Sequence, residues 1–108
     1  MTDKLVVLVN CSSSDEAQAI GKHLVEKRLA ACVNLVPGMQ SWYWWEGKVT
    51  HDNEVLVMIK TSRECFEKLE QEVARLHSYA VPEVIALQIV DGAKNYLSWI
   101  ESSLVGES

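Results

Sequence analysis

The feature that most constrains the fold is a pair of long strand-like runs that meet at one turn signal. The first run covers residues 31–45 and the second covers residues 49–59, with Glu46–Lys48 between them. Two such runs joined by a short glycine-containing turn are typical of a β-hairpin. Pro37-Gly38 interrupts the first run and predicts a bulge, a bend or a strand end, because proline cannot donate to a sheet ladder.

This predicted hairpin is longer than the domain that carries it. A compact chain of 108 residues has a diameter of about 34 Å, whereas a strand from Val33 to Trp45 runs about 40 Å. We expect the overhanging tip to place two aromatic rings on each strand face, and one subunit covers at most one face. We therefore predict a closed homo-oligomer; the alternative is a bent hairpin that covers its own rings. The predicted interface residues are Trp42, Tyr43, Trp44 and Trp45.

Amphipathic patterns predict two helices that flank the hairpin. Apolar residues recur at helical spacing between residues 14 and 29 and again between residues 66 and 76. Ser13 with Glu16, and Thr61 with Glu64, match the spacing of a capping box at the two helix starts.

The remaining apolar runs complete the element order. Residues 5–9 and 84–90 are continuous apolar runs typical of buried strands, and residues 96–100 indicate a short closing helix. The order is β-α-β-β-α-β followed by a helix, which predicts an α+β, ferredoxin-like sandwich with a four-stranded antiparallel sheet and two helices on one face. The length allows one domain, which we assign to residues 1–108.

Composition and charge exclude several classes. The chain is 48% hydrophobic, which is too much for a disordered protein, and no apolar run approaches the length of a membrane span. Its net charge of −5 repels nucleic acid and anionic membranes. The first residues lack the basic region and cleavage site of a signal peptide, so we expect a cytoplasmic protein with reduced thiols.

Cysteine and histidine are the first candidates for chemistry. Cys11 ends the first strand, Cys32 begins the second and His77 follows the second helix. Thiolate and imidazole donors suit copper or zinc, whereas a free cysteine is otherwise a small buried hydrophobe. Three other residues are expected to pack in the core or to lie in solvent: Cys65, His23 and His51.

A second group of polar residues lies near one predicted sheet edge. Lys60 ends a strand, Glu83 begins another, and Tyr79 and Pro82 lie in the connector before it. These residues predict a small-molecule pocket. The alternative is a salt bridge between Lys60 and Glu83 beside a tyrosine whose hydroxyl is hydrogen-bonded within the protein. The sequence holds no nucleophile elbow, zinc-protease motif or phosphate-binding loop, so we expect no enzyme activity.

Five blocks of the chain together resemble the CutA divalent-cation-tolerance family. They are residues 28–38, 43–47, 59–61, 77–83 and 96–100, and they follow one another in the family's order. The resemblance implies a ferredoxin-like subunit and a tightly packed homotrimer with an architecture similar to the PII signalling proteins. It also implies tolerance and binding of copper and other divalent cations.

The resemblance further implies a metal site. Cys11 matches a cysteine proposed as a copper ligand in bacterial members, and His77 matches a proposed histidine, whereas Leu76 stands where some relatives have a second histidine. We therefore expect copper(II) or another divalent cation to bind Cys11 and His77, assisted by Glu83, without turnover.

Two alternatives use the same fold differently. A PII-like signalling trimer would bind a small anionic metabolite or a partner protein in the cleft between subunits, near Lys60, Tyr79 and Glu83. An acylphosphatase-like enzyme would need an arginine near the first strand, where this chain has Asn10, Cys11 and Ser12.

Overall fold

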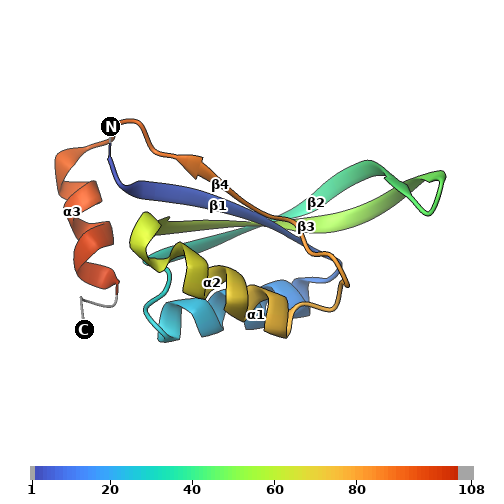
Figure 1. Cartoon of the computed structure of the whole chain (residues 1–108), viewed down its shortest axis with the longest axis horizontal. Helices are drawn as coiled ribbons and strands as arrows, with labels where there is room; N and C mark the ends of the chain where they lie inside the picture. The colour runs from blue at the N-terminus through green and yellow to red at the C-terminus, as the bar shows by residue number, and fades with distance from the viewer. Residues whose placement is uncertain (1, 105–108) are drawn as a thin grey trace.

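The computed structural model describes residues 2–104 and confirms the α+β architecture. The sheet has four antiparallel strands in the order β2-β3-β1-β4. Helices α1 and α2 lie against one face of the sheet, and α3 lies at one end of it (Figure 1). The elements are β1 (Lys4–Cys11), α1 (Ser14–Glu26), β2 (Cys32–Trp45), β3 (Lys48–Ser62), α2 (Arg63–Leu76), β4 (Val84–Gln88) and α3 (Lys94–Ser103).

Strand alternation separates a packed face of the sheet from an open one. In β1 every second side chain from Leu5 to Cys11 is buried against the helices. The partners on β3 alternate in the same way, since Val7 pairs with Ile59 and Val9 with Val57. The main core therefore fills the space between the sheet and α1 and α2.

The second predicted capping box is wrong. Ser13 caps α1 as expected, because its Oγ accepts the backbone N–H of Glu16 at 3.2 Å. The N-cap residue of α2 is Ser62, whose side chain makes no capping bond. The Thr61 hydroxyl instead donates to the buried carbonyl of Leu29 at 2.7 Å. Spacing alone does not distinguish a capping threonine from one that is recruited into the core.

Several predicted boundaries shift. Helix α1 ends at Glu26, because Arg28 has a φ of 57° and turns the chain so that Leu29 enters the core. Strand β4 ends at Gln88, before Val90, and α3 extends on both sides of the predicted 96–100 segment.

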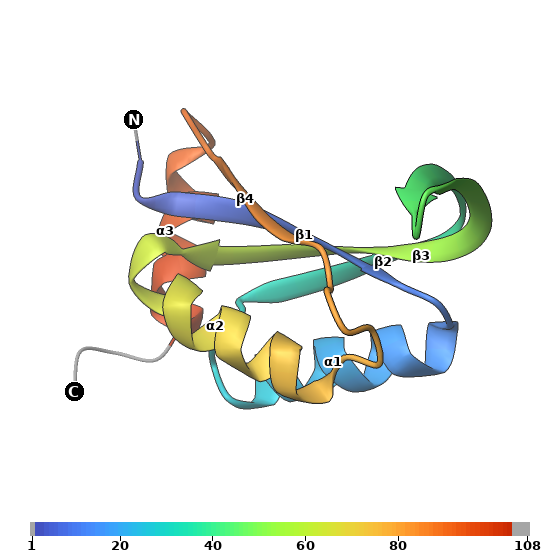
Figure 2. The ribbon, with the colours of Figure 1, turned by 45° about the vertical axis from the view of Figure 1, so that its right-hand side comes forward.

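The hairpin projects beyond the helical layer (Figures 1 and 2). Strands β2 and β3 pair as far as Trp45 and Lys48, and the turn residues Glu46 and Gly47 have φ angles of 50° and 78°. Two consecutive positive φ angles are typical of a type I′ turn. The molecule measures 44 × 25 × 21 Å, and its length comes from this hairpin. The predicted interruption at Pro37 is a bulge between Val36 and Met39.

The open face of the sheet is rich in apolar side chains. Helix α3 reaches only one end of it, where Lys4 Nζ donates to Glu101 Oε1 at 2.6 Å. Elsewhere on this face, Val36, Ile85 and Leu87 are 43–52% exposed. Within residues 2–104, no helix combines the length and the apolar character needed to cross a membrane. The apolar side chains of the face are Val6, Leu8, Val36, Leu56, Met58, Ile85 and Leu87.

Candidate functional site

The end of β1 supplies side chains to two polar sites on opposite faces of the sheet. Cys11 pairs with Val55 and points into the core, whereas Asn10 pairs with Leu56 on the open face. Neighbouring residues of a strand point to opposite faces. One short segment thus contributes to an inner cluster around Cys11 and to an outer cavity around Asn10.

The inner cluster consists of Cys11, Glu16 and His77. Each offers one potential ligand atom, and these atoms lie within 4.8 Å of one another. Cys11 Sγ lies 3.8 Å from His77 Nε2. The structure brings Cys11 and His77 together, although 66 positions separate them in the chain.

The imidazole of His77 is fully enclosed and uses both ring nitrogens. Nδ1 accepts the backbone N–H of Tyr79 at 3.1 Å, so the ring proton belongs on Nε2. Nε2 then donates to the backbone carbonyl of Asn10 at 2.6 Å. The side chain is 0% exposed. These two hydrogen bonds hold the imidazole in one orientation.

Glu16 is a member of the cluster that the sequence patterns assigned only to helix capping. Its carboxylate accepts the backbone N–H of Ser78 at 2.6 Å and the Ser78 hydroxyl at 3.1 Å. Oε2 lies 4.0 Å from His77 Nδ1. The carboxylate therefore holds the connector after α2 against the start of α1. The capping-box spacing marked this residue but did not reveal its tertiary partner.

The thiol of Cys11 is protonated at neutral pH. Burial and the nearby negative charges of Glu16 and Glu54 raise its pKa to about 12. A thiol with such a pKa reacts slowly, because the thiolate is the nucleophilic form.

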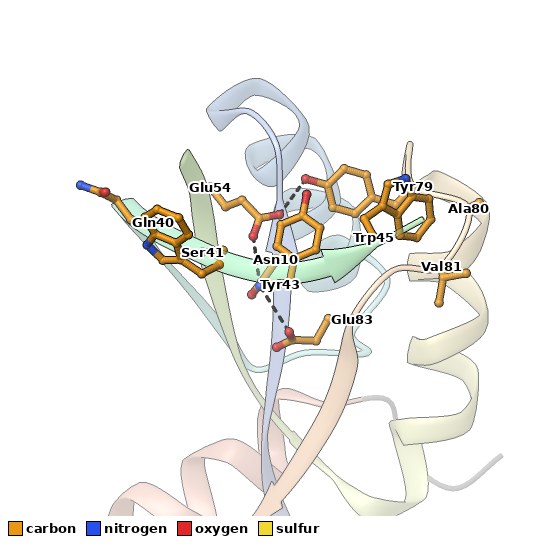
Figure 3. A pocket seen from close by; sticks show the side chains of 11 residues that line it. Asn10, Gln40, Ser41, Tyr43, Trp45, Glu54, Tyr79, Ala80, Val81 and Glu83 are labelled. Carbon is orange, nitrogen blue, oxygen red and sulfur yellow. Dashed lines mark hydrogen bonds between the residues drawn. The ribbon is translucent and has the colours of Figure 1, made fainter. Parts of the chain in front are cut away.

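The outer cavity opens on the other face, between the hairpin and the connector before β4 (Figure 3). Its volume is about 730 Å³. Tyr43 and Trp45 come from β2, Glu54 from β3, and Asn10 from β1. The full lining is Asn10, Gln40, Ser41, Trp42, Tyr43, Trp45, Glu54, Tyr79, Ala80, Val81 and Glu83.

Hydrogen bonds link four of the lining residues (Figure 3). The Tyr79 hydroxyl donates to Glu54 Oε2 at 2.7 Å. Asn10 Nδ2 donates to Glu54 Oε1 at 3.4 Å and to Glu83 Oε1 at 3.3 Å. Glu54 is only 6% exposed, so these donors satisfy a carboxylate that burial would otherwise disfavour.

Burial and the Glu54 carboxylate raise the pKa of two groups in this site. Burial and the Glu54 carboxylate raise the pKa of Glu83. Burial and the hydrogen bond to Glu54 raise the pKa of Tyr79. Both shifts favour the neutral forms of Tyr79 and Glu83, because a second negative charge beside the Glu54 carboxylate is unfavourable.

The structure separates the predicted pocket residues. Tyr79 and Glu83 line the cavity, and Glu83 lies with Asn10 rather than with Cys11 and His77. Pro82 lies between them in the chain but does not line the cavity. Lys60 lies elsewhere on the open face, where it donates to Asn34. Sequence reasoning missed Asn10 and Glu54. Glu54 directly precedes an apolar run, residues 55–59. A carboxylate next to a buried strand segment was the signal that could have indicated its role.

Cys65, His23 and His51 lie outside the two polar sites and make packing or pairwise contacts. Cys65 packs in a small core with Ile100, as expected. The prediction of a solvated side chain is wrong for His23, which is 22% exposed and whose Nε2 lies 2.6 Å from Glu72 Oε1, joining α1 to α2. His51 is exposed and stacks on Trp42 with ring centroids 4.2 Å apart. All three cysteines are free thiols.

The hairpin aromatics divide between the two faces as predicted. Trp42 and Trp44 share one strand face with His51 and Val49, and Tyr43 and Trp45 share the other. Trp42 lines the cavity as well as Tyr43 and Trp45. The four side chains are 37–74% exposed. The hairpin therefore does not cover its own rings.

Comparison with known proteins finds relatives that match this chain over most of its length; the chain spans nearly all of the Thermus thermophilus relative and about half of the Arabidopsis thaliana relative. The family model described as CutA1 divalent ion tolerance protein matches residues 5–103. The chain is 48% identical over 98 residues to the divalent-cation tolerance protein CutA of Thermus thermophilus, covering 91% of this chain and 95% of that protein. It is 44% identical to a chloroplastic CutA protein of Arabidopsis thaliana, covering 92% of this chain and 54% of the relative.

A solved structure of a divalent cation tolerance protein from Thermus thermophilus superposes with a TM-score of 0.93. It is 46% identical in sequence, and the match covers 94% of this chain and 99% of that one. The family model, the sequence identity and the structural superposition all indicate the same family. The chain belongs to the CutA1 divalent ion tolerance protein family.

Proposed function

We propose that this protein binds copper(II) or another divalent cation at the cluster of Cys11, Glu16 and His77. Binding itself, without turnover, is the proposed function. One observation carries the proposal: three potential ligand atoms of suitable chemistry lie within 4.8 Å of one another. The divalent-cation tolerance named for the relatives supports the same class of ligand.

The three side chains have suitable donor atoms for such a cation. In the metal-free protein, however, Cys11 is protonated and both ring nitrogens of His77 are hydrogen-bonded. Sulfur, imidazole nitrogen and carboxylate oxygen together suit copper and zinc. Cys11 must lose its proton, and His77 must release the N–H of Tyr79 or the carbonyl of Asn10. Metal and protons therefore compete, and affinity rises with pH.

A single-thiol background gives the sharpest test of this site. Cys32→Ser and Cys65→Ala remove the other thiols, so that uptake of copper(II) by native mass spectrometry reports on Cys11. We expect one copper per subunit, and we expect Cys11→Ser or His77→Ala to lower the affinity at least tenfold. Glu83→Gln is the matched control, since Glu83 lies on the opposite face. Equal affinity in all three variants would contradict the site.

We also propose that the subunit assembles into a homotrimer. The supporting observations are the open apolar face of the sheet and the exposed rings of the hairpin. Surfaces of this kind are typical of interfaces between copies of one chain. The native mass of metal-free protein tests the proposal. A trimer is expected, and Trp42→Ser with Trp44→Ser should weaken it; a monomer at micromolar concentration would refute it.

A further inference from the structure

The outer cavity combines aromatic walls with negative charge. Tyr43, Trp45 and Tyr79 present rings to it, and Glu54 and Glu83 present carboxylates. The lining of the cavity, all within residues 2–104, includes no lysine and no arginine. Lys60, the expected cation, is bound to Asn34 away from the cavity. The charge therefore disfavours an anionic ligand and favours a cationic one.

The carboxylates do not form a metal site. Across the described part of the chain, the one group of three metal-ligating side chains is Cys11, Glu16 and His77. Glu54 already accepts hydrogen bonds from Tyr79 and Asn10. Glu54 and Glu83 are the only acidic side chains among the described residues that line the cavity, which is few for a bare divalent ion, whereas an organic cation needs only a carboxylate and apolar walls.

We propose that the outer cavity binds an organic ammonium ion. The volume of about 730 Å³ is in the range of small-molecule sites. The ring faces of Trp45 and the two tyrosines attract a cation and accommodate its aliphatic part. Glu83 receives the ammonium group, because within residues 2–104 its carboxylate has a single hydrogen-bond partner, the amide of Asn10. This site is separate from the proposed metal site.

Butylammonium chloride is a suitable probe of this proposal. We would follow the indole N–H signals of the tryptophans by NMR during a titration at neutral pH and constant ionic strength. Saturable shifts are expected with butylammonium, and none with butyrate or butanol at the same concentrations. Glu83→Gln should weaken binding about tenfold, because it removes a charge-assisted hydrogen bond. Trp45→Leu should weaken binding about threefold.

Glu70→Gln is the matched control. It removes the same charge from an exposed position on α2 that does not line the cavity, so it corrects for general attraction to a protein of net charge −5. The affinity for butylammonium should change less than twofold. The proposal is overturned if Glu70→Gln weakens binding as much as Glu83→Gln, if butyrate saturates the same signals, or if butylammonium produces no shift.

The proposed functions can fail independently. Cys11→Ser should lower the copper affinity at least tenfold and leave butylammonium binding unchanged. If a second copy of the chain fills the cavity with a basic side chain, butylammonium will not bind until the assembly is dissociated, and that result counts against a small-molecule site.

Discussion

The two faces of the sheet beside Asn10 and Cys11 use similar polar groups in opposite ways. The inner cluster is closed, since His77 is fully enclosed and both its nitrogens are occupied. The outer cavity is open, and Glu83 offers a carboxylate to solvent with one protein partner. The difference indicates that the inner groups contribute to stability in the metal-free protein, whereas the outer groups are free to contact a ligand.

His77→Ala tests the closed side most directly and should have the largest effect. It removes the partner of the Asn10 carbonyl and of the Tyr79 N–H inside the protein. We expect a loss of about 3 kcal/mol in the free energy of unfolding. Urea unfolding at one fixed protein concentration measures it. Glu70→Ala, at an exposed position on α2, is the control and should change stability by less than about 0.5 kcal/mol.

Alkaline unfolding tests whether the inner thiol is held protonated. The pKa of Cys11 is raised in the folded state from 9.0 to about 12. The stabilisation is complete below pH 9 and is lost as pH rises toward 12, because the unfolded chain gives up the proton first. Wild type should lose about 2 kcal/mol more than Cys11→Ala between pH 9 and about pH 11. Identical slopes in a pH series of urea unfolding would contradict the shift.

Tyr79→Phe probes the boundary between the two sites. The ring remains, but Glu54 loses the hydroxyl that donates to Oε2. We expect a loss of about 1 kcal/mol in unfolding free energy, since the carboxylate is buried. Tyr96→Phe removes the hydroxyl of a tyrosine that is 43% exposed and serves as the control. Equal effects of the two substitutions on the urea midpoint would show that the Glu54 contact does not stabilise the fold.

Glu83→Gln should have the smallest effect on stability. Glu83 is exposed and accepts one long hydrogen bond at 3.3 Å, which glutamine can also accept. A change of less than about 0.5 kcal/mol is expected by urea unfolding. Glu16→Gln, in the closed cluster, should cost about 1 kcal/mol. A larger stability loss for Glu83→Gln than for Glu16→Gln would contradict the proposed difference between the closed cluster and the open cavity.

The difference between the faces also explains which site residues could be predicted. Cys11 and His77 stood out because thiols and imidazoles are rare and chemically distinctive. Glu16 and Glu54 did not, because glutamates are common on surfaces. Glu16 had a complete local explanation as a capping residue, and only its contact with Ser78, 62 positions away, reveals the tertiary role. Lys60 and Glu83 were grouped by their position at strand ends, but they do not share a site.

The sequence by itself determined the element order, the long hairpin and the placement of its rings on two faces. These features depend on periodicity, turn residues and strand length, which are local properties of the chain. Tertiary structure alone decided that Cys11, Glu16 and His77 meet on one face while Asn10, Glu54 and Glu83 meet on the other. The physical reason is that strand pairing and the path of the connector after α2 bring distant segments together, and no local pattern encodes those distances.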